Sequence, residues 1–102
     1  MAEIKIANKN EIKEGQGTVV LVNEKEIALF NIQGNFYAID NNCCHRGGPL
    51  AEGEIEDKIV TCPWHGWKFD VKTGECIIPG SAKLNSYNIN IKGEEIFISI
   101  GE

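Results

Sequence analysis

The sequence predicts an all-β fold, and three observations support this. Apolar and polar residues alternate at period two in many short segments, which turn-forming residues separate. No window of eleven or more residues has the period of an amphipathic helix. Many short strands at this spacing are typical of a β-sandwich or barrel. We expect strands over residues 4–7, 18–22, 26–32, 35–40, 58–63, 68–71, 85–91 and 95–100.

Tight turns between these strands are expected at Asn23-Glu24, Gln33-Gly34, Lys72-Thr73-Gly74 and Lys92-Gly93. Glycine supplies the positive φ that such turns need.

Other segments interrupt the strand pattern. Residues 51–57 are expected to hold a short turn at most, and residues 77–83 to be irregular. Residues 41–57 and 62–67 are rich in Gly and Pro, which predicts two loops projecting from the sheet. Loops on a rigid β scaffold are a suitable place for a functional site.

Length and charge limit the possible functions. The 102 residues fit one domain, residues 1–102. Acidic residues outnumber basic ones by 15 to 10, and no cluster of Lys and Arg is present, which argues against nucleic-acid binding. An acidic surface suits docking on a basic partner, with association that depends on salt.

The sequence also bears on location. No apolar run approaches the roughly 20 residues that a membrane helix needs. The N-terminal MAEIKIANKN lacks the apolar core of a signal peptide, so we expect a cytoplasmic protein with no membrane attachment. A reducing compartment favours metal ligation or catalysis by cysteines over structural disulfides.

Both histidines lie within three residues of a cysteine. The pattern is Cys43-x-His45, sixteen residues, and then Cys62-x-x-His65. Two thiolates and two imidazoles can hold a tetrahedral metal such as structural zinc, or a two-iron cluster. Zinc sites usually open with C-x₂₋₄-C, and a single residue between two ligands is awkward around one ion. A catalytic thiol in CPWH would leave the other pair unexplained. Buried cysteines and histidines without a metal are the remaining interpretation.

The flanking residues add a resemblance. CCHRGGPLAEGEIEDKIVTCPWHGWKFDVKTGE resembles the Rieske signature, with its GGPL, CPWHGW and D-x-x-TGE elements. The later PGSAKLNSYNINIKGEEIFI resembles the C-terminal half of the same family. The resemblance covers roughly residues 35–100, and it is to the Rieske-type ferredoxins that feed electrons to bacterial ring-hydroxylating oxygenases.

This resemblance implies one [2Fe–2S] cluster with two Cys and two His ligands. Cys43 and Cys62 would ligate the inner iron, and His45 and His65 the outer iron. It implies a Rieske-like sandwich or partly open barrel, with a small cluster-binding subdomain formed by two loops. Pro79 would belong to a loop that covers the cluster.

Two cysteines are not needed as ligands. Cys44 occupies the x of C-x-H, and Cys76 is most simply a small core residue.

The resemblance also predicts a low reduction potential. High-potential relatives carry a disulfide beside the cluster, but the matching positions here are Gly48 and Trp64. They also carry hydroxyl donors where this chain has Trp67 and Phe69. Fewer donors stabilise the added electron less, so we expect a potential on the order of −150 mV.

These features predict an electron carrier and not an enzyme, because no nucleotide, flavin or mononuclear-iron motif is present. We expect it to pass electrons from a reductase to a ring-hydroxylating oxygenase. The alternatives are a small Rieske subunit of a larger enzyme, such as assimilatory nitrite reductase, and a redox- or iron-sensing module.

Partner docking is expected around the cluster. Trp64, Pro49 and Leu50 would form an apolar rim, and at least one of Trp64 and Trp67 would pack beneath the loops. Nearby charge would come from Glu52, Glu54, Glu56 and Asp57.

Overall fold

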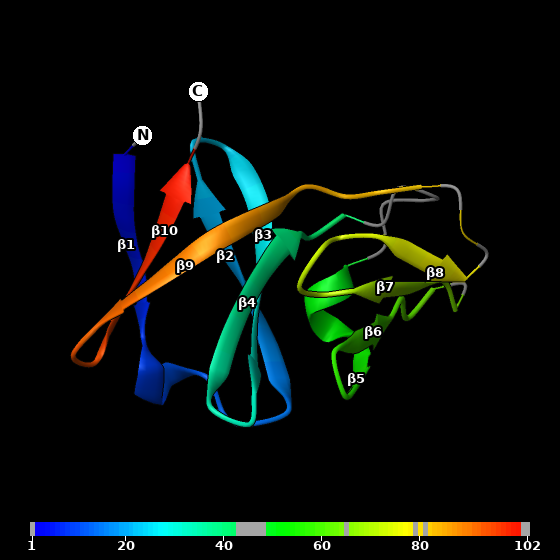
Figure 1. The fold of residues 1–102 in the computed structure, drawn as a ribbon, viewed down its shortest axis with the longest axis horizontal. Coiled ribbons are helices and arrows are strands. Elements are labelled where there is room, and N and C mark those ends of the chain that lie inside the picture. The colour runs from blue at the N-terminus through cyan, green and yellow to red at the C-terminus, as the bar shows by residue number, and fades with distance from the viewer. Residues whose placement is uncertain (1, 43–48, 65, 79, 81, 101–102) are drawn as a thin grey trace.

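The chain folds into two antiparallel sheets of unequal size (Figure 1). The computed structural model describes residues 2–42, 49–64, 66–78, 80 and 82–100. The larger sheet has the strand order β1-β10-β9-β4-β3-β2, and the smaller sheet has the order β5-β6-β7-β8.

The strands of the larger sheet are β1 (Ala2–Asn8), β2 (Gln16–Val22), β3 (Lys25–Ile32), β4 (Asn35–Asp40), β9 (Ser86–Lys92) and β10 (Glu95–Ile100). Those of the smaller sheet are β5 (Glu54–Glu56), β6 (Ile59–Thr61), β7 (Lys68–Asp70) and β8 (Cys76–Ile78). The described helical turns are η1 (Lys9–Glu11) and η2 (Leu50–Glu52), both of the 3₁₀ type.

The all-β prediction is confirmed, and each of the eight expected strands is present. Two strands were missed. Residues 51–57 were expected to hold a turn at most, but they contain η2 and β5, and β8 lies at the start of the segment expected to be irregular. Both strands have three residues, as do β6 and β7, which were predicted. The difference is in the surrounding sequence, since β5 lies in an acidic run that contains glycine and β8 borders a segment with proline and glycine.

Strand β3 is buried on both of its faces, from Ile27 to Ile32. Ile27 and Leu29 pack in a cluster inside the curl of the larger sheet, with Ile96 and Ile98. The side chains between them point the other way. Ala28, Phe30 and Ile32 belong to a second cluster, which also contains Leu50, Val60 and Phe69 from the smaller sheet and its connections. The core therefore consists of two clusters, and β3 lies between them and contributes side chains to both.

The tight turns of the larger sheet have the expected backbone. Asn23 and Glu24 have φ of 51° and 68°, and Gln33 and Gly34 have φ of 55° and 85°. Positive φ at both central residues is the type I′ geometry that matches the twist of paired strands. Only the second pair includes a glycine, so Glu24 takes this conformation despite its side chain.

Among the described residues there is no helix with the length and apolar character needed to cross a membrane.

Candidate metal centre

Of the four expected ligands, Cys62 is the one that the structure describes. Cys43, His45 and His65 lie outside the described residues, as do Cys44 and Pro79. Cys62 follows β6 directly and is 2% exposed. It packs in the apolar cluster shared by the two sheets, and its thiol is free. A buried thiol at the end of a strand is a suitable metal ligand, since its backbone is fixed and water has little access to it.

The second loop is a closed turn. The backbone N–H of Cys62 donates to the carbonyl of Trp67 at 2.7 Å, and the N–H of Gly66 donates to the carbonyl of Cys62 at 3.1 Å. Gly66 has φ of +79°, which a residue with a Cβ rarely adopts. These bonds return the chain to β7 within a few residues of Cys62.

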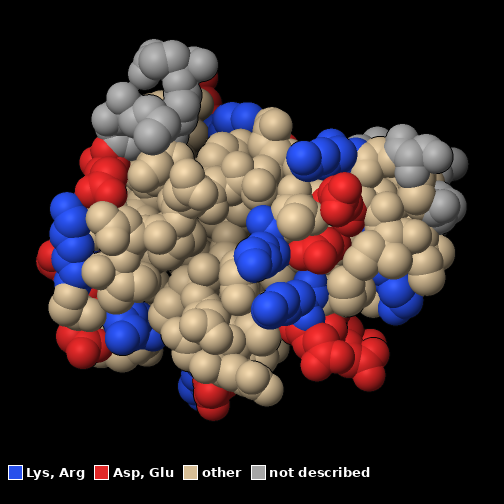
Figure 2. Space-filling model, in the orientation of Figure 1, with Lys and Arg blue, Asp and Glu red and all other residues tan. Residues whose placement is uncertain are grey.

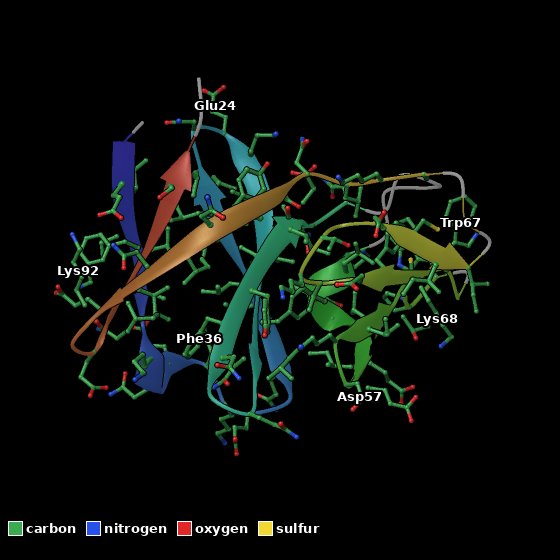
Figure 3. The ribbon with its side chains drawn as sticks, viewed as in Figure 1. Glu24, Phe36, Asp57, Trp67, Lys68 and Lys92 are labelled. Atoms are coloured by element: carbon green, nitrogen blue, oxygen red, sulfur yellow. The ribbon has the colours of Figure 1, made fainter. Side chains whose placement is uncertain are left out.

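The two tryptophans of this loop have different environments. The Trp67 ring lies 6.4 Å from the ring of Phe69, which is fully buried, and it packs on the apolar cluster. Trp64 is 57% exposed. Trp67, which Figure 3 labels at one end of the smaller sheet, therefore packs inward on the core. The loop residues beneath which a tryptophan was expected to pack lie partly outside the described residues.

The ends of the first loop are held together. Asn42 and Pro49 form an isolated antiparallel bridge on either side of residues 43–48. The N–H of Leu50 donates to the carbonyl of Asn41 at 2.8 Å, and the N–H of Ala51 donates to the side-chain oxygen Oδ1 of Asn41 at 2.9 Å. The residues that precede and follow residues 43–48 are therefore held side by side.

The two loops are next to each other at their described ends. A Cβ on Gly53 would overlap the carbonyl oxygen of Thr61, so only glycine allows η2 to approach β6 this closely. A hollow of about 350 Å³ is lined from both sides by Glu52, Gly53, Glu54, Thr61, Cys62, Pro63 and Gly66. The segment that follows the first loop therefore borders the backbone that carries Cys62.

The segment around residue 79 is anchored to β8 at its described end. The N–H of Cys76 donates to the carbonyl of Ala82 at 2.9 Å, and the N–H of Leu84 donates to the carbonyl of Gly74 at 2.8 Å. A Cβ on Gly74 would overlap the carbonyl oxygen of Leu84. Cys76 is 8% exposed and has a free thiol, which fits the prediction of a small core residue.

The expected apolar rim was partly wrong. Trp64 is exposed and Pro49 is half-buried, but Leu50 is 0% exposed and belongs to the core. The reason is that η2 turns Leu50 inward, against the apolar cluster shared by the sheets. The expected acidic side chains are all exposed, at Glu52, Glu54, Glu56 and Asp57. Figure 2 shows acidic groups gathered at the lower right, in the region where Figure 3 labels Asp57.

A polar cluster at the end of β4 was not predicted from the sequence. The hydroxyl of Tyr87 donates to Oδ1 of Asp40 at 2.6 Å, and Nζ of Lys25 donates to that hydroxyl at 3.0 Å. The other carboxylate oxygen of Asp40 accepts from the N–H of Asn85 at 3.0 Å, and the N–H of Asp40 donates to the carbonyl of Asn85 at 3.0 Å. These bonds join the residues just before the first loop to those that re-enter β9.

This cluster shifts two pKa values. Burial raises the pKa of the Tyr87 phenol, and the hydrogen bond to Asp40 raises it further. The pKa of Lys25 is raised by its hydrogen bond to Tyr87 first and then by the charge of Asp40.

The sequence reasoning also missed Asn41 and Gly53. Their neighbours in sequence were interpreted as loop, and nothing in the residue types themselves predicts a buried amide or a close backbone approach. The one signal in the sequence is that Gly53 interrupts an acidic run.

The one described donor, Cys62, fits a [2Fe–2S] cluster. Cys62 is buried and free, and the described ends of the two loops are adjacent. Among the described residues, no group of three or more His, Cys, Asp or Glu side chains is placed to hold a metal ion.

Comparisons with known proteins agree with this arrangement. The model of the Rieske [2Fe-2S] domain family matches residues 2–88. The ferredoxin component of the naphthalene 1,2-dioxygenase system from Pseudomonas aeruginosa is 35% identical over 91 residues, which is 88% of each chain. The ferredoxin subunit of 3-phenylpropionate/cinnamic acid dioxygenase from Escherichia coli K12 is 41% identical over 78 residues, or 74% of each chain.

Solved structures have the same fold. The ferredoxin of carbazole 1,9a-dioxygenase from Nocardioides aromaticivorans matches with a TM-score of 0.90 and 26% identity, over 97% of this chain and 98% of that one. A complex of reduced oxygenase and oxidized ferredoxin in carbazole 1,9a-dioxygenase matches with a TM-score of 0.87 and 25% identity, over 95% of this chain and 92% of that one. A putative NADH-dependent nitrite reductase small subunit from Mycobacterium tuberculosis has a TM-score of 0.91 over 99% and 96% of the chains, but at 18% identity it shows the fold alone.

The family match spans most of the chain, and the buried Cys62 lies in the expected ligand loop. The chain therefore belongs to the Rieske [2Fe-2S] domain family.

Proposed function

We propose that this chain is a one-electron carrier that takes electrons from a reductase and passes them to a ring-hydroxylating oxygenase. The observation that carries this proposal is the 35% identity to a dioxygenase ferredoxin component over 88% of both chains. When bound, a Rieske-type cluster accepts and releases one electron at a time. The relatives are named as ferredoxin components and not as catalytic subunits, so the chain itself is a carrier and not an enzyme.

The proposed ligands are Cys43 and Cys62 for one iron and His45 and His65 for the other. The buried, free thiol of Cys62 supports this set, as does the closeness of the two loops at their described ends. The proposed role of Pro79 is to cover the site. It is supported by the hydrogen bonds that anchor the neighbouring segment to β8.

Apolar described residues around Cys62 keep water away from it. Leu50, Val60 and Phe69 are fully buried in the same cluster, and position 69 carries no hydroxyl. Hydrogen bonds to the sulfurs raise the potential of such centres. We therefore expect a potential near the low end of the Rieske range, on the order of −150 mV.

The proposed docking surface combines Trp64 with the acidic edge of the smaller sheet. Trp64 is 57% exposed, and Glu54 and Glu56 lie exposed on the edge strand β5. The chain carries a formal charge of −5, which favours basic partners and steers their approach. Electron-transfer encounters are usually small and transient, so we expect weak binding that salt weakens further.

We also propose that residues 1–102 form one domain and that it works in the cytoplasm. The apolar cluster shared by the two sheets supports the first proposal, because neither sheet buries that face alone. The free thiols of Cys62 and Cys76, the two described cysteines, support the second, because thiols persist in a reducing compartment.

The ligand set is tested by comparing variants of the four proposed ligands with variants of the two other cysteines, Cys44 and Cys76. Cys43→Ser, His45→Ala, Cys62→Ser and His65→Ala should each remove the bound iron and the visible colour. Cys44→Ser, adjacent to a proposed ligand, and Cys76→Ser should keep both, together with a Rieske-type paramagnetic resonance signal after reduction with dithionite. Retention of the signal in Cys43→Ser and its loss in Cys44→Ser would contradict the assignment.

The partner is tested by electron transfer. The reduced protein should be reoxidised rapidly by a Rieske-type ring-hydroxylating oxygenase in a stopped-flow experiment, at a rate that falls as salt rises. Glu54→Gln with Glu56→Gln should slow this transfer and weaken its salt dependence, while the potential stays the same. Fast transfer to a nitrite reductase large subunit, and none to an oxygenase, would favour the small-subunit alternative.

A further inference from the structure

Two asparagines are the buried polar side chains among the described residues. Asn31, in β3, is 7% exposed. Its Nδ2 donates to the carbonyl of Ile12 at 2.8 Å, and its Oδ1 accepts from the N–H of Gly34 at 2.9 Å. The Asn31 amide thus stabilises two connections of the larger sheet, the one between β1 and β2 at Ile12 and the turn between β3 and β4 at Gly34.

Asn41 has the same kind of bonds in a different place and is 2% exposed. Its Oδ1 accepts from the N–H of Ala51 at 2.9 Å, and its Nδ2 donates to Oε1 of Glu26 at 3.2 Å. Its backbone carbonyl accepts from the N–H of Leu50, and its N–H donates to the carbonyl of Glu26 at 3.1 Å. One residue therefore joins the larger sheet to both ends of residues 42–49.

The far end of this connection is fixed against the larger sheet. A Cβ on Gly17 in β2 would overlap the ring of Phe30 and would lie 3.0 Å from the carbonyl oxygen of Ala51. The segment of η2 thus occupies the space that Gly17 leaves open, which limits its movement further toward the sheet. The amide of Asn41, together with the backbone bond from the N–H of Leu50, resists the opposite movement, away from the end of β4. Without it, the buried N–H of Ala51 would lack its partner, which favours opening of the loop.

We propose that Asn41 is a positioning residue for the metal centre, which it serves by fixing the separation of the two ends of the ligand loop. This rests on the proposed function, which places Cys43 and His45 in that loop. Asn41 acts through Leu50 and Ala51. Groups that hydrogen-bond directly to a metal ligand commonly change metal affinity by 10- to 100-fold when they are replaced. Asn41 acts one step further from the metal, so we expect an effect near the low end of that range.

Asn31→Ala is a matched control for Asn41→Ala, since each variant removes a buried amide with two hydrogen bonds. Both variants should lower the midpoint of thermal unfolding. Only Asn41→Ala should broaden or shift the resonance signal of the reduced protein, change its potential, and speed the loss of visible colour to an iron chelator by on the order of tenfold.

A conservative series covers the case in which Asn41→Ala does not accumulate as folded protein. Asn41→Asp keeps an acceptor for Ala51 but loses the donor to Glu26 and places two carboxylates together. Adding Glu26→Gln supplies that donor from the other side, so the double variant should lose colour more slowly than Asn41→Asp alone.

The role of Asn41 would be overturned if Asn41→Ala matched Asn31→Ala in its resonance signal, its potential and its rate of colour loss. It would also be overturned if the double variant were no slower to lose colour than Asn41→Asp. A wild-type protein with no Rieske-type signal would instead overturn the proposed function, and this role with it.

Discussion

The two sheets are built differently. Strands β2 and β3 pair over seven residues, and β3 and β4 pair over six. In the smaller sheet, β5 and β6 pair over three residues, and β7 and β8 pair at two positions with an irregularity between them. Strands β2, β3 and β4 of the larger sheet therefore obtain their regularity from their own backbone pairing, whereas β4 and β9 pair at two positions. The smaller sheet depends on what surrounds it: the shared apolar cluster, close approaches at Gly53 and Gly74, and the ligand loops.

Removing the cofactor should have the largest effect, and it should act on one sheet only. We expect amides of β5–β8 to lose most of their protection from hydrogen exchange in the iron-free protein, while amides of β2–β4 keep theirs. Metal binding energy acts as folding energy where no preformed site exists without it. Exchange measured by mass spectrometry on the two forms tests this. Equal loss of protection in both sheets would show that the sheets do not differ in this way.

A pair of leucines sharpens the comparison at the level of single side chains. Leu29 and Leu50 are both 0% exposed, but they belong to different clusters. Each replacement by Ala should lower the free energy of unfolding by about 2–5 kcal/mol. Only Leu50→Ala should also hasten colour loss to a chelator, because Leu50 borders the ligand loop. If Leu29→Ala and Leu50→Ala lost colour at similar rates, the two apolar clusters would not differ in their effect on the metal centre.

The smallest effect concerns alkaline pH and the junction between the sheets. The pKa of Tyr87 is raised by burial and by Asp40, and that of Lys25 is raised by Tyr87 and Asp40. The stability from a raised pKa is fully present below the unfolded-state value, about 10 for Tyr and 10.4 for Lys. It is lost as pH rises through the folded-state value. The thermal midpoint of the wild type should therefore fall above about pH 10, and that of Tyr87→Phe should fall less. An equally steep fall in Tyr87→Phe would contradict this.

The sequence was most informative where the pattern follows from local geometry. Alternation over six or more residues and two-residue turns such as Gln33-Gly34 depend on neighbouring residues alone, so the larger sheet could be predicted. The ligand spacing could be recognised because both pairs of donors are short motifs. Leu50 was misplaced because its burial is decided by η2 and by Phe69, which comes from a distant part of the chain. Asn41 and Gly53 were missed for the same reason, because their roles depend on tertiary contacts. Asn41 hydrogen-bonds to Ala51 and Glu26, and Gly53 lies against the carbonyl oxygen of Thr61.

The contact between Asp40 and Asn85 has a topological consequence. Strands β4 and β9 are paired neighbours in the larger sheet, and the N–H of Asp40 donates to the carbonyl of Asn85 at 3.0 Å. The whole metal-binding portion thus departs and rejoins at one residue pair, Asp40 and Asn85, which two hydrogen bonds join, like an extended hairpin loop. Insertions succeed best where the two ends of a segment lie close together. This lobe could accordingly be lengthened or shortened at its own turns without changing the register of β4 and β9, but it could not be moved to another β-hairpin alone, because its apolar face is buried against β3.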